Sequence, residues 1–159
     1  MTNPRLYHYS EEPFVFDPSR VYPQDDVPMF KPRGLWLSVE TDDEDSFGWR
    51  DWCDRENFRR HALTHRTELT LLPDVHVLHI DRSSALLDFT RRYRTTVEEE
   101  LSYRMIDWTA VTRDYAGLII APYDWDLRLD HRTTWYYAWD CASACIWECS
   151  VLQQEVNAS

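Results

Sequence analysis

The chain has only three glycines, Gly34, Gly48 and Gly117, among its 159 residues. Phosphate-binding loops, such as the P-loop and the dinucleotide loop of βαβ folds, need several glycines close together. Three scattered glycines build neither loop, and they build no nucleophile elbow. The scarcity of glycine therefore excludes the common glycine-rich nucleotide folds.

The size and charge of the chain further limit its number of domains and its possible functions. With 43% hydrophobic and 14% aromatic residues, 159 residues suffice for one domain with a real core, and we expect a single domain over residues 1–159. The formal net charge of −11 disfavours a protein that holds nucleic acid mainly by counterion release.

Two arginine-rich segments, 55–66 and 91–94, stand out against this acidic average. They suit either local nucleic-acid contacts or, as the interpretation we favour, solvated surfaces paired with the abundant Asp and Glu. The residues concerned are Arg55, Arg59, Arg60, His61, His65, Arg66, Arg91, Arg92 and Arg94.

No apolar run approaches the roughly 20 residues that span a bilayer, and the start MTNPRLYHYSEEP lacks the plan of a signal peptide. We therefore expect a soluble, cytoplasmic protein with reduced thiols and no membrane partner. Cys141, Cys145 and Cys149 recur every four residues, but this spacing matches no common zinc pattern. His61 with His65 lacks an evident third ligand, so we expect no metal site.

The hydrophobic periodicity predicts three helices, from Trp49 to Leu63, over 84–94 and from Ile106 towards Tyr115, with Gly117 as the C-cap of the third. The segments THRTELTLL and DVHVLHI alternate and predict a hairpin. LIIAPY predicts a buried strand, and the aromatic segments TTWYYAWD and SACIWECSVL predict further strands. This order indicates a mixed α+β domain rather than a regular βαβ alternation.

Three short segments carry polar or aromatic groups at strand-like positions. The first is LYHYS, the second is KPRGLWLS, and the third is IWE in the last part of the chain. Glu148 lies in the least charged part of the molecule, between Trp147 and Cys149, and strand alternation turns it away from both. Glu148 is therefore the first candidate for a functional carboxylate, and Asp140, in WYYAWDCAS, is the second.

In their order and separation, these segments resemble the marker motifs of the ADP-ribosyltransferase family, in its diphtheria toxin and poly(ADP-ribose) polymerase branch. His8-Tyr9-Ser10 matches the motif His-x-Ser, and Gly34-Leu35-Trp36-Leu37 matches Gly-Ile-Tyr-Phe. Glu148 stands for the glutamate of a late strand. The departure is Trp36 in place of the usual Tyr, which keeps the stacking face and loses the hydroxyl.

The resemblance implies a split β-sheet core with flanking helices and NAD as the substrate. His8 would bind the adenosine ribose, Ser10 the nicotinamide amide, and Trp36 would stack on the nicotinamide ring, with Gly34 and Ser38 also in the binding segment. Glu148 would be the catalytic residue together with His8, because an anion stabilises the positive charge that develops as nicotinamide leaves.

The acceptor of ADP-ribose, a protein or a nucleic acid, stays open, and so do three alternatives. One is a non-catalytic binding module whose acidic surface engages a basic protein partner. The others are an NAD glycohydrolase and an RNA 2′-phosphotransferase on the same fold. The last needs converging arginines, for which the opening segments supply Arg5, Arg20 and Arg33. Trp49 and Trp52 either cover the pocket or simply pack.

Overall fold

The computed structural model describes residues 4–41, 47–95 and 105–156. Within them a curled sheet has seven strands in the order β4-β5-β6-β2-β1-β3-β7, and β4 with β5 is its parallel pair. The strands are β1 (Arg5–Ser10), β2 (Leu35–Glu40), β3 (His65–Leu71), β4 (Val77–Ile80), β5 (Gly117–Ile120), β6 (Ser143–Ile146) and β7 (Leu152–Gln154).

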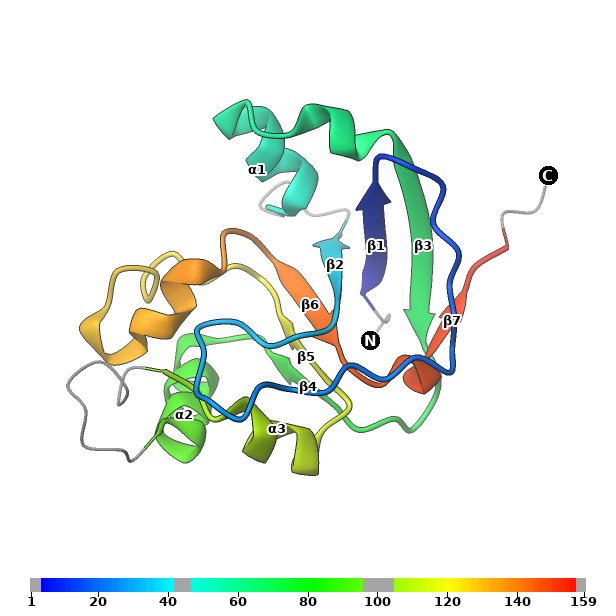
Figure 1. Ribbon diagram of the computed structural model, residues 1–159. Coiled ribbons are helices and arrows are strands. Elements are labelled where there is room, and N and C mark those ends of the chain that lie inside the picture. The colour runs from blue at the N-terminus through cyan, green and yellow to red at the C-terminus, as the bar shows by residue number, and fades with distance from the viewer. Residues whose placement is uncertain (1–3, 42–46, 96–104, 157–159) are drawn as a thin grey trace.

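The helices lie in two places (Figure 1). Helices α2 and α3 lie beside β4 and β5 at one edge of the sheet, whereas α1 lies above β2, which it contacts. The helical elements are α1 (Trp49–Glu56), η1 (Arg60–Leu63), α2 (Ser83–Tyr93), α3 (Trp108–Asp114), η3 (His131–Ala138) and η4 (Cys149–Val151), of which the η elements are 3₁₀ helices. None of the described helices is long and apolar enough to cross a bilayer.

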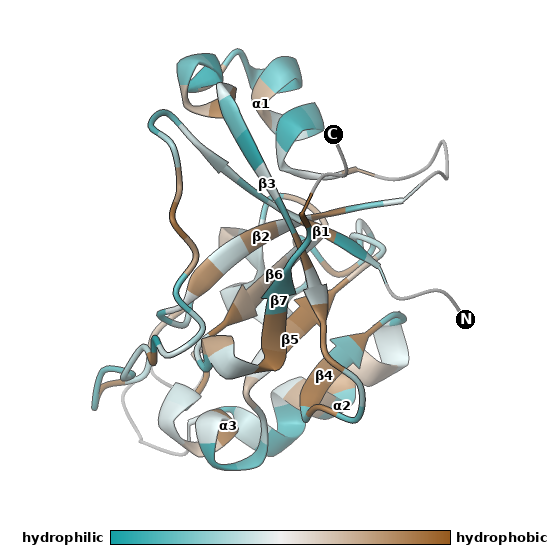
Figure 2. Ribbon diagram, turned by 90° about the vertical axis from the view of Figure 1, so that its right-hand side faces the viewer, coloured by the Kyte–Doolittle hydropathy of each residue, from teal (hydrophilic) through white to brown (hydrophobic). Residues whose placement is uncertain are grey.

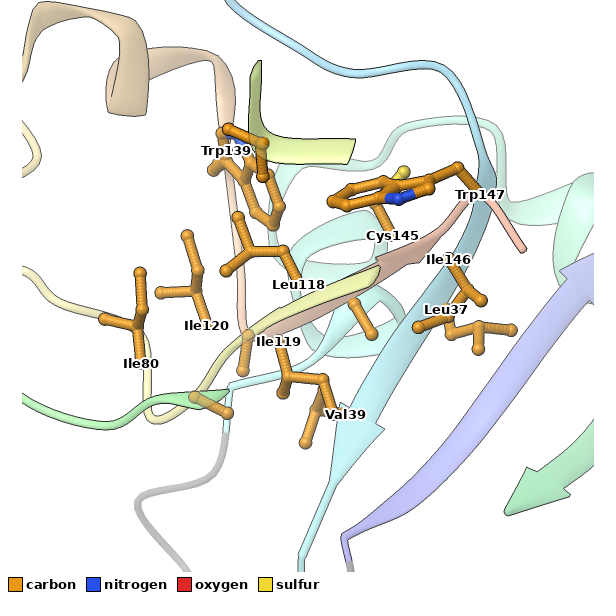
Figure 3. Packing of buried hydrophobic residues seen from close by; sticks show 14 of the residues in the cluster. Leu37, Val39, Ile80, Leu118, Ile119, Ile120, Trp139, Cys145, Ile146 and Trp147 are labelled. Carbon is orange, nitrogen blue, oxygen red and sulfur yellow. The ribbon is translucent and has the colours of Figure 1, made fainter. Parts of the chain in front are cut away.

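The core surrounds the middle of the sheet, where β5 and β6 are hydrophobic along their length, while α1 is mainly hydrophilic (Figure 2). All four residues of each strand are buried. Leu118 lies on the same side of β5 as Trp139, whereas Ile119 lies on the opposite side near Val39 (Figure 3). Both faces are thus covered, which explains why these strands are continuous apolar runs rather than alternating ones.

Several sequence-based predictions are confirmed. The domain is mixed α+β, α2 occupies the predicted segment, and α3 begins at Trp108 inside the predicted range. The carboxylate of Asp107 accepts a hydrogen bond from the backbone N–H of Ala110 at 3.1 Å, which caps the first turn of α3. Leu118, Ile119 and Ile120, the first half of LIIAPY, form β5 together with Gly117 and are buried as expected.

The first predicted helix is wrong in its length. Helix α1 ends at Glu56, and a separate 3₁₀ turn, η1, follows. Asn57 and Arg59 both have left-handed backbones, with φ of 50° and 41°, and an α-helix cannot continue through such residues. Periodicity alone does not show this break, because the apolar spacing persists through Phe58.

The predicted hairpin is also wrong. Strand β3 pairs with β1 and β7, while β4 lies at the opposite edge and pairs with β5 in parallel. Alternation and a turn signal identify two strands, but the partner of each strand is set by burial elsewhere in the sheet.

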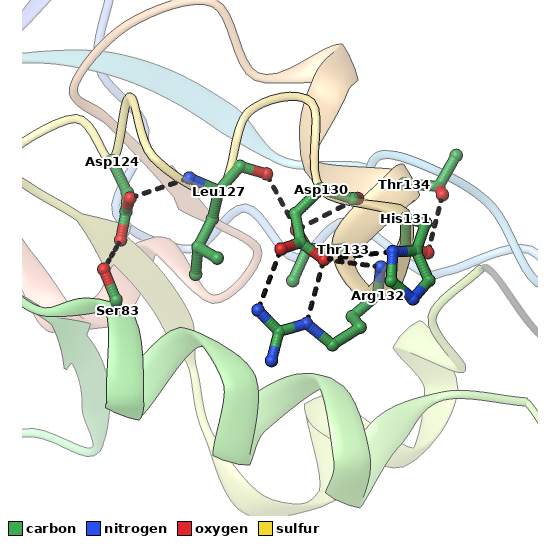
Figure 4. Close-up of polar contacts among 8 residues, drawn as sticks. All are labelled: Ser83, Asp124, Leu127, Asp130, His131, Arg132, Thr133 and Thr134. Carbon is green, nitrogen blue, oxygen red and sulfur yellow. Dashed lines mark hydrogen bonds and ion pairs between the residues drawn. The ribbon is translucent and has the colours of Figure 1, made fainter.

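Two further predictions fail near the third helix and in the last third of the chain. Gly117 is not a helix C-cap but the first residue of β5. TTWYYAWD forms η3 instead of a strand, because the carboxylate of Asp130 accepts from the backbone N–H of Arg132 at 2.8 Å and starts a helical turn. The hydroxyl of Thr133 then donates to the carbonyl of Leu127 at 2.8 Å, as Figure 4 shows.

Candidate functional site

The sheet opens between its two central strands β1 and β2. Strand β1 pairs with β2 from Arg5 to Tyr7, with Tyr7 opposite Ser38, but it pairs with β3 as far as Ser10. Strand β2 meanwhile stays paired with β6 from Leu35 to Ser38. Beyond Tyr7, β1 therefore leaves β2, and backbone groups in the gap need other partners.

The side chain of His8 occupies this point of departure. Its Nδ1 lies 3.1 Å from the carbonyl oxygen of Trp36, and its ring lies 4.2 Å from that of Phe14. Burial lowers the pKa of His8, partly offset by the bond to Trp36, so the neutral imidazole is favoured. In that state Nδ1–H donates to the carbonyl, and Nε2 remains an acceptor.

A cavity of about 310 Å³ lies over the opening. The sheet contributes Tyr7, His8, Tyr9, Trp36 and Ser38 to its wall. Tyr7 lies opposite Ser38, and alternate residues of a strand share a face, so Tyr9 and Trp36 lie on the same face of the sheet. Such a volume is at the lower end for pockets that hold drug-sized ligands.

Helix α1 and η1 cap one side of the cavity through Trp49, Arg59 and Ala62. The indole of Trp49 stacks on that of Trp52 at 5.2 Å and 9°. The backbone N–H of Trp49 donates to the hydroxyl of Ser38 at 2.9 Å, so the predicted binding residue Ser38 also anchors the cap. Trp49 therefore fulfils both interpretations of the sequence, since it covers the cavity and packs.

The segment shortly before β6 also lines the cavity, through Trp139, Asp140 and Cys141. Trp139 contacts Trp36 with an edge-to-face geometry at 4.7 Å. Burial raises the pKa of Asp140, whereas the positive charges of Lys31 and Arg128 lower it. The cavity therefore combines three indoles, those of Trp36, Trp49 and Trp139, with one partly buried carboxylate.

Tyr9 is held rigidly at the cavity wall. Its hydroxyl donates to the carboxylate of Glu40 at 2.6 Å, and the guanidinium of Arg50 lies 5.8 Å from its ring. Burial and the Glu40 carboxylate together raise the pKa of Tyr9, so it stays a neutral phenol. Tyr9 is a rigid wall residue rather than an acid or a base.

The structure brings His8, Trp36 and Ser38 to one cavity but does not bring Ser10, Gly34 or Glu148 there. The hydroxyl of Ser10 is enclosed and has no hydrogen-bond partner among the described residues. Ser10 follows the last β1 residue that lines the cavity, and it stays paired with His65 of β3.

Glu148 lies beyond the end of β6, not on a strand that reaches the cavity. Its backbone N–H donates to the carbonyl of Ala116 at 3.2 Å, and it forms an isolated bridge with Val21. Its side chain is exposed while Trp147 and Cys149 are buried, so the predicted alternation holds but turns Glu148 to solvent. The carboxylate that lines the cavity is the second-ranked candidate, Asp140.

Gly34 marks a close approach, but to a strand rather than a ligand. A Cβ at this position would lie 2.5 Å from the sulfur of Cys145 and 2.9 Å from the carbonyl oxygen of Ile146. Both atoms belong to β6. Gly34 therefore lets β2 and β6 pair closely at the start of β2.

Sequence reasoning missed Lys31, Arg59, Tyr9 and Trp139. Lys31, Tyr9 and Trp139 all lie in segments that the sequence singled out, KPRGLWLS, LYHYS and WYYAWDCAS, although none was assigned to the site. Arg59 reaches the cavity through the turn before η1, which is not visible in the local sequence.

The cysteines and histidines form no metal centre among the described residues, where no group of three or more metal-binding side chains converges. Burial raises the pKa of Cys141 to about 12 and that of Cys145 well above its ordinary value, so both are held as thiols. His61 lies in η1 and His65 in β3, so helical spacing does not apply to them.

Much of the arginine-rich surface is paired with acids. The ion pairs are Arg55 with Glu56, Arg60 with Asp54, Arg91 with Asp88 and Arg92 with Asp114. This arrangement matches the solvated, paired interpretation of these segments rather than a continuous basic strip.

No protein-family model, curated protein or solved structure matches the chain.

Proposed function

We propose that the cavity binds NAD or a closely related nucleotide, and that the protein is an ADP-ribosyltransferase-like enzyme in which Asp140 is the catalytic carboxylate. The observation that carries this proposal is that Asp140 and the indole of Trp36 line the same cavity, where β1 leaves β2. The opening of the sheet at His8 also suits the split core that the motifs imply.

The chemistry needs a flat apolar wall and a fixed anion. A nicotinamide ring against Trp36 is oriented at little entropic cost, since the indole is itself held by Trp139. When the glycosidic bond breaks, its electron pair goes to the nicotinamide nitrogen and the ribose gains positive charge. An ionised Asp140 stabilises that charge, and the acceptor or water then attacks the ribose and releases a proton.

The size of the cavity fits part of the ligand. At about 310 Å³, it suits the nicotinamide ribose half, so the other half of a dinucleotide extends past the mouth. His8 also lines the cavity, and its bond to Trp36 leaves Nε2 without that partner.

The test compares two carboxylates. Nicotinamide release from NAD is measured in wild type, in Asp140→Asn and in Glu148→Gln, with NAD affinity measured by calorimetry. We expect Asp140→Asn to reduce turnover by about 10²–10³-fold with little change in affinity, because the lost charge matters mainly in the transition state. Glu148→Gln, on the exposed side, should match wild type.

Other outcomes change the conclusion. Loss of turnover in Glu148→Gln alone would restore the assignment made from the motifs. Wild-type protein that neither binds nor consumes NAD would overturn the proposal.

A nucleotide-binding module without turnover is the second candidate, because Trp36 lacks the hydroxyl of the usual Tyr. It is identified by NAD binding that depends on Trp36 without any release of nicotinamide. The phosphotransferase alternative finds less support, since Arg33 pairs with Asp25 at 2.9 Å and Arg20 lies over the ring of Tyr22, both away from the cavity wall.

A further inference from the structure

Two positively charged side chains line the cavity of this acidic chain, Lys31 and Arg59. Within residues 4–41, 47–95 and 105–156, neither makes an ion pair with an acidic residue, although the neighbouring Arg33 and Arg60 do. A chain of net charge −11 offers many carboxylates, so two unpaired cations at one cavity need a reason.

Their positions come from different parts of the chain. Lys31 precedes β2, and its Nζ lies 5.0 Å from the ring centroid of Trp36. Arg59 stands at the start of η1, in the cap on the other side. The two cations therefore approach the cavity from the sheet side and from the cap side.

The backbone of Arg59 gives an independent sign. Its φ of 41° and ψ of 39° are left-handed, a conformation that suits Gly or Asn but is unfavourable for a long side chain. The nearby left-handed position is occupied by Asn57, which tolerates it. Residues in sparsely populated backbone regions often cluster at functional sites, and of the three left-handed non-glycine residues described, Asn57, Arg59 and Asp74, Arg59 is the one that lines the cavity.

We infer that Lys31 and Arg59 form an anion subsite at the mouth of the cavity, which binds the diphosphate of a nucleotide ligand. This inference rests on the proposed function and specifies the ligand class. Guanidinium and ammonium groups donate charge-assisted hydrogen bonds to phosphate oxygens. Asp140 in the same cavity interacts with Lys31 through its charge, but no carboxylate of the described residues forms an ion pair with Lys31 or Arg59. Because the cavity holds only the ribose half, the diphosphate lies at its mouth.

The experiment uses ADP and inorganic pyrophosphate as charged probes, adenosine as the uncharged probe, and Arg60 as the matched control. Arg60 is the next residue, is exposed, and is already paired with Asp54 at 3.1 Å. Calorimetry measures the Kd of each probe for wild type, Lys31→Gln, Arg59→Asn and Arg60→Gln at low and at physiological salt.

Lys31→Gln and Arg59→Asn should each raise the Kd of ADP and of pyrophosphate by about tenfold or more, as expected for loss of a charged hydrogen bond. The Kd of adenosine should stay within about twofold of the wild-type value. Arg60→Gln should stay within about twofold for every probe. Arg59→Asn should unfold at the same temperature as wild type or higher, because Asn accepts the left-handed backbone. That result separates a lost contact from a damaged fold.

Two results overturn the inference. One is an equal loss in Arg60→Gln, which indicates general surface charge, and the other is unchanged ADP affinity in both cavity variants. The outcome is separable from the proposed function. Phosphate binding that depends on Arg59, without nicotinamide release, leaves the subsite standing and removes the enzyme. NAD turnover that depends on Asp140 but is unchanged by the Arg59 substitution supports the enzyme and overturns the anion subsite.

Discussion

Replacing Gly34 by Ala tests whether this glycine serves the sheet or the ligand. The added Cβ would meet the sulfur of Cys145 at 2.5 Å and the carbonyl oxygen of Ile146 at 2.9 Å, where ordinary contacts are 3.4–4 Å. Strands β2 and β6 must move apart by roughly 1 Å at their last pair, Leu35 with Ile146. Overpacking of this kind costs about 1–3 kcal/mol, and a backbone neighbour places Gly34→Ala near the upper limit.

The assay is urea unfolding of wild type and Gly34→Ala, followed by tryptophan fluorescence, with a thermal scan beside it. A loss of about 2–3 kcal/mol corresponds to a fall of roughly 4–12 °C in a chain of this size. Gly117→Ala is the comparator, because its Cβ first meets the methyl end of the flexible Ile146 side chain, and the backbone of Cys145 lies at 3.1 Å. Gly117→Ala should therefore lose less stability than Gly34→Ala.

A different pattern refutes this reasoning. If Gly34→Ala unfolds with wild-type stability and loses only nucleotide binding, the glycine lies against the ligand, as the motif resemblance implies. A double variant with Cys145→Ala adds a check, since removing the sulfur should recover part of the loss while the Ile146 carbonyl still limits it.

The remaining predictions concern a buried hydrogen bond and a pH profile. Thr90→Val should lose about 1–3 kcal/mol in urea unfolding, because the buried indole N–H of Trp135 donates to the Thr90 hydroxyl at 3.0 Å and would lose its acceptor; an unchanged midpoint contradicts it. If Asp140 acts as the carboxylate, turnover should fall as pH falls through its pKa, which burial places above the ordinary value. Arg128→Met removes a positive charge that lowers this pKa, so the acid limb of the pH profile should move to higher pH, and a shift to lower pH contradicts the assignment.

Local patterns predicted the elements whose signals are local. Helix α2 follows from the apolar spacing of Leu86, Phe89 and Tyr93, all of which are buried, and β5 follows from an apolar run. The resemblance of the motifs, rather than a local pattern, predicted that His8 and Trp36 share one site, and both residues lie on strands that line one cavity.

The pairing partners of the strands and the reversals of the chain were not predicted, because they depend on residues distant in the sequence. The segment after β3 looks like a hairpin turn, yet β4 finds its partner in β5. The break after Glu56 arises where two left-handed residues let η1 fold back over the sheet and bring Arg59 to the cavity. No spacing of apolar residues reveals such a reversal.

The choice between Asp140 and Glu148 depends on the same kind of information. Both lie just outside the two ends of β6, in similarly aromatic surroundings, so composition cannot separate them. Antiparallel pairing places Ser143, the start of β6, beside Ser38, and Ser38 lies opposite the last residue of β1 that pairs with β2. The segment before β6 therefore reaches the cavity, while the segment after it turns towards Ala116 and Val21. The register of β6 against β2 thus selects Asp140 for the cavity and turns Glu148 towards solvent.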